Sequence, residues 1–222
     1  MFRTLRTLAA LASLALLPAG AGGAASPGSS FTSNGVTITS TAAVFDTVAF
    51  QGETEWDMTL GRVYMKQYAS LGGVTVDAFD DYEVTGAAPG TPVLVYAILE
   101  VDGAVWTAGC GASGCAGMYE VTFRHETDSL VLRRDASLFS GRSEFHDGMQ
   151  LTIPFVAGQS ERIEIRAFGR RYPGGSHLSE ADCRLRFVLV DEGVGITSCK
   201  GFAGAIVPVR TNSWGRIKTM YR

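Results

Sequence analysis

The sequence has few of the residues that build common catalytic centres. It contains three histidines and four cysteines among 222 residues. An H-E-x-x-H zinc site needs a second histidine, but none follows His125-Glu126 at that spacing. Gly111-Ala-Ser-Gly114 lacks the full G-x-S-x-G pattern of a hydrolase nucleophile. We therefore predict a protein that is not an enzyme, with no catalytic residues, no metal site and no cofactor.

The chain also lacks an excess of positive charge. Its formal net charge is −3, and it becomes −5 when Arg3 and Arg6 are left out. A mildly acidic protein is a poor ligand for nucleic acid or an anionic membrane surface. After residue 25 no apolar run reaches the roughly 18 residues of a membrane-spanning helix. We expect no nucleic-acid partner and no transmembrane anchor.

The first 25 residues have the three parts of a secretory signal peptide. Arg3 and Arg6 precede an apolar run from Leu8 to Leu17, and small residues follow as far as Ala25. We predict a signal peptide over residues 1–25, with cleavage between Ala21 and Ala25. The mature protein is then secreted, either extracellular or at the cell surface. Residues 26–33, rich in serine, are predicted to form a disordered leader.

The four cysteines fit an exported protein. Cys110 and Cys115 are separated by four residues, and Cys183 and Cys199 bracket a predicted hairpin. Oxidising compartments favour disulfides, so we expect Cys110–Cys115 and Cys183–Cys199 bonds. A zinc site is the alternative, because the first pair has metal-ligand spacing. The second pair does not.

Alternating apolar and polar residues dominate the chain from residue 34 to residue 210. Val74, Val76, Ala78 and Tyr82, for example, share one parity, as expected for a half-buried strand. About ten to twelve such segments, separated by turn residues, predict one all-β domain, an antiparallel β-sandwich of jelly-roll-like form. The basic tail at residues 211–222 would form a short amphipathic helix, a docking segment or a solvated terminus.

One segment differs from this alternation. Residues 93–99 are continuously apolar, which predicts a central strand from Pro92 to Val101 that is covered on both faces. Asp102-Gly103 is a favoured dipeptide for a tight hairpin turn. We therefore expect the chain to reverse there, with Ala104–Trp106 returning.

Three stretches together resemble bacterial exoproteins sorted by the exosortase (PEP-CTERM) system. They run from Thr41 to Gly52 (TAAVFDTVAFQG), from Pro89 to Gly103 (PGTPVLVYAILEVDG) and from Glu180 to Gly195 (EADCRLRFVLVDEGVG). The resemblance implies a β-sandwich fold and export, and it implies no reaction. Those proteins end with a Pro-Glu-Pro motif, an apolar helix and a basic cluster. This chain lacks the motif and the helix, so the anchoring route is not implied.

Two sets of side chains are candidates for ligand binding. Trp56, Tyr64 and Tyr68 share strand parity and could form an aromatic platform for sugars, although core packing is their more ordinary role. Trp106 could add a contact from a loop. Asp77, Asp81 and Glu83 share a predicted solvent face, which suits either calcium binding or a plain charged surface.

These observations predict a secreted, non-enzymatic β-sandwich with a structural or adhesive role at the cell surface or in the extracellular matrix. The partner would be a cell-envelope protein or a glycan. A carbohydrate-binding module is the alternative function, and an extracellular hydrolase is the least favoured.

Overall fold

The computed structural model describes residues 28–33, 36–49, 52–67, 73–108, 117–126, 128–135, 141–171, 176–202 and 206–208. These residues form fourteen strands and no helix. Within them, therefore, no helical segment is long and apolar enough to cross a membrane. The predicted signal peptide and the basic tail lie outside the described residues, as do Tyr68, Cys110 and Cys115.

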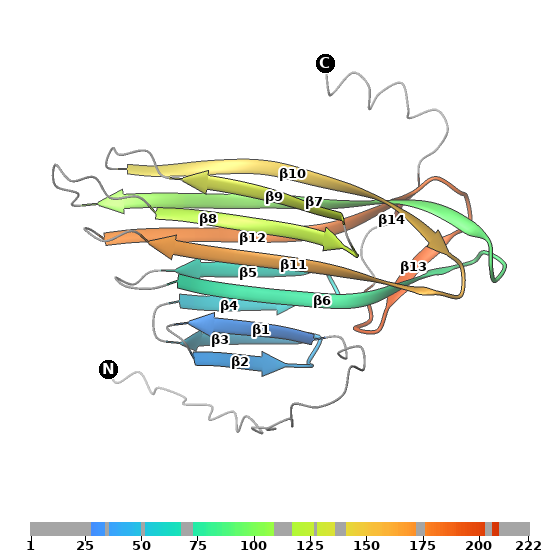
Figure 1. The fold of residues 1–222 in the computed structure, drawn as a ribbon, viewed down its shortest axis with the longest axis horizontal. Coiled ribbons are helices and arrows are strands. Elements are labelled where there is room, and N and C mark those ends of the chain that lie inside the picture. Colours follow the sequence, from blue (N-terminus) through green and yellow to red (C-terminus); the bar gives the residue numbers. More distant parts are fainter. Residues whose placement is uncertain are drawn as a thin grey trace, which may run out of the picture.

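The strands form two sheets whose long strands run along the long axis of the molecule (Figure 1). Sheet A has the order β2 (Val36–Ser40), β1 (Gly28–Ser33), β6 (Gly73–Thr85), β11 (Ser160–Arg171), β8 (Gly117–His125), β9 (Asp128–Asp135), with β13 (Gly195–Ser198) also beside β6. Sheet B has the order β10 (Gly141–Val156), β7 (Pro92–Ala108), β12 (Ser176–Leu189), β5 (Arg62–Gln67), β4 (Gly52–Asp57), β3 (Val44–Ala49), with β14 (Ile206–Pro208) also beside β12.

The chain crosses repeatedly between the two sheets. After β5 it passes to β6 in sheet A, to β7 in sheet B, and then alternates through β8 and β9, β10, β11, β12, β13 and β14. The described pairings are antiparallel except for the short parallel one between β12 and β14. The all-β, jelly-roll-like sandwich predicted from the sequence is confirmed.

Side chains of alternate residues fill the space between the sheets. On β6, Val74, Val76, Ala78, Tyr82 and Val84 are buried, as their common parity predicts. They pack with inward residues of the other strands into one continuous apolar core. Burial of this apolar surface is the main force that holds the sheets together.

The predicted leader is part of the sandwich. Residues Gly28–Ser33 form β1, which pairs with β2 on one side and β6 on the other. Phe31 is fully buried, with Ser29 and Ser33 on the same inward parity. The prediction of disorder over residues 26–33 is wrong for these six residues, because one buried aromatic ring and two strand partners outweigh a serine-rich composition.

Asp102-Gly103 does not form the predicted hairpin turn. β7 runs straight through it, for 17 residues from Pro92 to Ala108. Gly103 faces inward, and a Cβ atom placed there would clash with the phenol ring and hydroxyl of Tyr119 in sheet A. The glycine is therefore needed for close approach of a phenol ring rather than for a turn, which no local sequence pattern reveals.

β7 is also not covered on both faces. Val93, Val95, Ala97 and Leu99 are buried between the sheets, as predicted. On the outer face, however, Leu94 is 42% exposed, and Tyr96 and Ile98 are only half-buried. β7 lies inside sheet B, between β10 and β12. The continuous apolar run thus goes with a strand that has a neighbour on each edge, although the outer face of that strand is exposed to solvent.

The predicted Cys183–Cys199 bond is wrong, because both residues are free thiols. Cys183 faces inward from β12 of sheet B, whereas Cys199 follows β13 in sheet A and is exposed. The chain between them crosses from one sheet to the other instead of forming a hairpin. Buried Asp80 of β6 holds that crossing: it accepts hydrogen bonds from the Ser198 hydroxyl at 2.5 Å and the Lys200 amide at 3.1 Å.

Candidate binding site on the outer face of sheet B

A hollow of about 450 Å³ lies on the side of sheet B that faces away from sheet A. Four neighbouring strands form it: β5, β12, β7 and β10. This volume is within the range of small-ligand sites in proteins, about 300–1,000 Å³. The lining residues are Tyr64, Asp102, Gly103, Ala104, Arg142, Glu144, Phe145, His146, Glu180 and Asp182.

Strand register explains why these residues meet. Tyr64 pairs with Asp182, Asp182 with Asp102, and Asp102 with His146, so four strands place four side chains in one row. In the adjacent row, Glu180 pairs with Ala104 and Ala104 with Glu144. Because residues two apart on a strand face the same side, both rows lie on the outer face.

Ala104 forms the floor of the hollow. Its single methyl group is buried, although the residue has outward parity on β7. The longer side chains of Glu180 and Glu144 stand on either side of it, and Arg142 contacts both of them. The guanidinium of Arg142 lies 2.6 Å from a Glu180 oxygen and 3.0 Å from a Glu144 oxygen. A small residue among large charged ones is what leaves the space open.

The other two carboxylates of the hollow also have cationic partners. The guanidinium groups of Arg62 and Arg184 each lie 2.9 Å from an oxygen of Asp182. The hydrogen bond to Asp182 raises the pKa of Arg62. His146 Nδ1 lies 2.5 Å from Asp102 Oδ1, and this hydrogen bond raises the pKa of His146 above its usual value. Every carboxylate in the hollow is thus held in place by an arginine or by His146.

Among the described residues, Trp56 and Tyr64 do not form the candidate aromatic platform, and Trp56 has the core-packing role instead. Trp56 is fully buried and stacks on Phe45, with ring centroids 4.4 Å apart. In the β4–β5 register Trp56 pairs with Val63, while Tyr64 pairs with Glu55. The turn between the strands therefore reverses the parity, so Trp56 points inward and Tyr64 outward. Because the shared parity of Trp56 and Tyr64 was counted through that turn, the prediction that both rings lie on one face is wrong.

Two of the four aromatic candidates do lie on the outer face. Tyr64 lines the hollow, and its hydroxyl lies 3.3 Å from a Glu53 oxygen. Burial, followed by the charges of Glu180 and Glu53, raises the pKa of Tyr64. Trp106 pairs with the lining residue Arg142 in the β7–β10 register, is not itself part of the lining, and is 40% exposed. The aromatic contribution is therefore one ring at the hollow and one near it.

The acidic candidates on β6 are paired on the outer face of sheet A. Asp81 lies 2.7 Å from Arg162, and Asp77 lies 3.3 Å from Arg166. Burial raises the pKa of Asp77. These carboxylates form cross-strand ion pairs between β6 and β11, which agrees with the prediction of a charged sheet surface.

Sequence reasoning missed the charged residues of the hollow. Their signal was present, since Arg142, Glu144 and His146 alternate along one strand and Glu180 and Asp182 along another. What was missing was the order of strands in the sheet. β5, β7, β10 and β12 are not consecutive in the chain, so nothing local indicates that they lie side by side.

No family model matches the chain, and no curated protein matches it. Among solved structures it is similar to TmCBM61 in complex with beta-1,4-galactotriose, with 10% identity, a TM-score of 0.24 and coverage of 56% of this chain and 70% of that one. It is also similar to the cryo-EM structure of Broad Bean Stain Virus, with 13% identity, a TM-score of 0.27 and coverage of 88% and 98%. Likenesses at these scores carry no functional conclusion.

Proposed function

We propose that this protein is a secreted, non-enzymatic adhesive β-sandwich that binds a neutral glycan in the hollow of sheet B. The observation that carries this proposal is the arrangement around Ala104. A small floor residue is surrounded by four carboxylates, one guanidinium and the Tyr64 ring. Carboxylate oxygens accept hydrogen bonds from hydroxyl groups, guanidinium groups donate them, and an aromatic ring offers an apolar face.

The charge of the hollow favours a neutral ligand over an acidic one. Its lining includes Asp102, Glu144, Glu180 and Asp182, against Arg142 and His146. Among the lining residues carboxylates therefore outnumber cations, because Arg62 and Arg184 contact Asp182 from outside the lining. This excess disfavours an anionic sugar, since like charges at close range weaken binding. Sugar hydroxyls instead satisfy the carboxylates without adding charge.

The ion pairs also favour binding over hydrolysis. A glycosidase needs one carboxyl group in an apolar, unpaired setting that keeps it protonated as the acid. Three of the four carboxylates contact an arginine, and the fourth, Asp102, contacts His146. Such pairing fixes hydrogen-bond acceptors in place, which is useful for recognition and leaves no evident acid.

The test is a glycan array probed with the purified protein, followed by calorimetry with the best neutral glycan. Tyr64→Ala removes the ring, and Ala104→Leu fills the floor of the hollow. We expect each variant to bind about tenfold more weakly or worse, corresponding to a loss of about 1.4 kcal/mol. Tyr96→Ala is the matched control, since Tyr96 lies on the same outer face of β7 away from the hollow.

Unchanged affinity in Ala104→Leu would show that the glycan binds elsewhere, and failure to bind any neutral glycan would overturn the proposal. Release of reducing sugar ends from a bound glycan would overturn its non-enzymatic part. Preference for acidic glycans would contradict the charge argument.

A further inference from the structure

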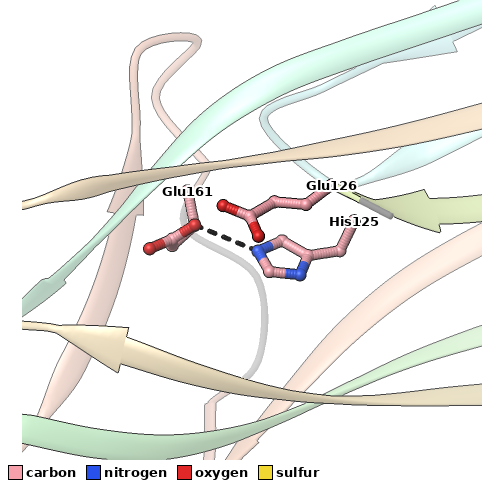
Figure 2. Close-up of side chains that lie close together, drawn as sticks. All are labelled: His125, Glu126 and Glu161. Atoms are coloured by element: carbon pink, nitrogen blue, oxygen red, sulfur yellow. Dashed lines mark hydrogen bonds and ion pairs between the residues drawn. The ribbon is translucent and has the colours of Figure 1, made fainter. Parts of the chain in front are cut away.

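A second group of polar side chains lies at one end of the sandwich, away from the hollow. His125 ends β8, Glu126 follows it, and Glu161 lies near the start of β11. His125 Nε2 lies 3.0 Å from Glu161 Oε2, and these two side chains are 8% and 16% exposed. Figure 2 shows both carboxylates directed toward the same edge of the imidazole ring.

The inward placement of this pair is unusual for its strands. His125 follows the parity of Tyr119, Val121 and Phe123, all fully buried. Glu161 follows the parity of Ile163 and Ile165, which are also buried. A buried ionisable side chain costs free energy unless charges or a metal compensate it. The end of β8 and the start of β11 thus each carry an inward polar group where an apolar one would cost less.

Glu126 brings a third donor to the pair. It is the one described non-glycine residue with a positive φ, 46°, a backbone conformation uncommon for residues with a side chain. Its carboxylate is exposed and lies close to the histidine ring (Figure 2). One nitrogen and two oxygens from the three residues all lie within 4.8 Å of one another.

We propose that His125, Glu126 and Glu161 bind one zinc ion. Imidazole nitrogen and carboxylate oxygen are both common zinc ligands, with bond lengths of about 2.0–2.2 Å. Tetrahedral ligands at such lengths are about 3.4 Å apart. The 3.0 Å between His125 and Glu161 is already near this spacing, and the third donor lies within 4.8 Å. Rotation of the exposed Glu126 side chain would bring its carboxylate toward the other two.

The donor set selects against calcium and magnesium, which take oxygen ligands. It also explains how a chain without H-E-x-x-H could still assemble three ligands. Ile163 of β11 pairs with His125 of β8. Glu161 lies two residues before Ile163 and therefore faces the same side of the sheet as His125, so the neighbouring strand supplies the ligand that a second histidine supplies in the motif. Three protein ligands leave one coordination position for water or a small ligand. The ion would also tie the end of β8 to the start of β11.

The His146–Asp102 pair provides an internal comparison. It makes the same kind of contact, yet His125, Glu126 and Glu161 form the one group of three such donors found this close together in the described residues. Replacing His146 therefore controls for the loss of a histidine that has a carboxylate partner but is not part of the proposed zinc site. This site is separate from the hollow, so its test does not depend on glycan binding.

The experiment is zinc titration by calorimetry of the full chain, first treated with EDTA and dialysed. Accessible thiols are blocked with iodoacetamide, so that thiolates do not compete for zinc. We expect one zinc ion per chain, with little heat from magnesium or calcium.

The variants Glu161→Gln and Glu126→Gln should weaken zinc binding by about 10–100-fold or more, because each removes a ligand. His146→Gln should bind as the wild type does. Glu126 is exposed, so its variant is expected to fold even if Glu161→Gln is destabilised. Absence of stoichiometric binding, or equal affinity in Glu126→Gln and wild type, would overturn the proposal.

Discussion

Two histidine–carboxylate pairs occupy opposite settings in this sandwich. His125 and Glu161 lie between the sheets, with side chains 8% and 16% exposed. His146 and Asp102 lie on the outer face of sheet B, with side chains 75% and 51% exposed. Both pairs join neighbouring antiparallel strands, β8 with β11 and β7 with β10. They differ in the side of the sheet on which the paired side chains lie: inward for His125 and Glu161, outward for His146 and Asp102.

This difference shows that strand parity sets the surroundings of a pair. An exposed ion pair gains little because water competes with the contact and screens the charges. A buried partner cannot be replaced by water, so its loss leaves a polar atom unsatisfied. Similar contacts should therefore contribute unequally to folding, and the inner pair should matter more.

The comparison is sharpest within β7, where inner and outer residues alternate. Leu99→Ala removes a fully buried side chain and should lower the free energy of unfolding by about 2–5 kcal/mol. Leu94→Ala removes a side chain that is 42% exposed and should cost less than about 1.5 kcal/mol. Urea denaturation of both variants measures the difference. Equal costs would mean that the outer face of β7 is covered.

The histidine pairs themselves give the next largest effect. In EDTA at pH 7, Glu161→Ala should cost about 1–3 kcal/mol, because it leaves His125 without its partner. Asp102→Ala should change the unfolding free energy by no more than about 0.5 kcal/mol, as at other exposed positions. The same urea titration compares the two. A larger cost for Asp102→Ala would reverse the ranking by burial.

The smallest effect concerns the pH dependence of the outer pair. The hydrogen bond to Asp102 raises the pKa of His146 in the folded chain above its ordinary value of about 6.5. The stabilisation is fully present below the unfolded pKa and is lost as the pH rises through the higher folded value. NMR titration of His146 should give a pKa above 6.5, and Asp102→Asn should lower it. Identical titration curves would contradict a contact between the two residues in solution.

Burial periodicity explains how much of the fold the sequence revealed. Alternation on β6, β8 and β11 identified strands whose inward residues are buried, because one face of each sheet is apolar and the other wet. The prediction of a turn failed at Gly103, where the role of a residue depends on a contact with the opposite sheet. Gly103 looked like a turn residue, but it makes room for the ring of Tyr119.

The candidate sites were less accessible to sequence reasoning than the fold. Tyr64 and Trp106 were identified as aromatic candidates, and both lie on the outer face of sheet B. Trp56 was wrongly given the same face as Tyr64, because the β4–β5 turn reverses parity. Glu161 was missed as a partner of His125, because 36 residues separate them in the chain.

The sequence by itself determined the class of fold, since a period of two in apolar residues is imposed by backbone geometry. It also determined which residues have outward parity within a strand, provided that no turn intervenes. Only the tertiary structure decided the order of strands in each sheet. That order brings β5, β12, β7 and β10 together around Ala104 and puts Glu161 beside His125. Strand order depends on packing across the whole core, and no local pattern of residues encodes it.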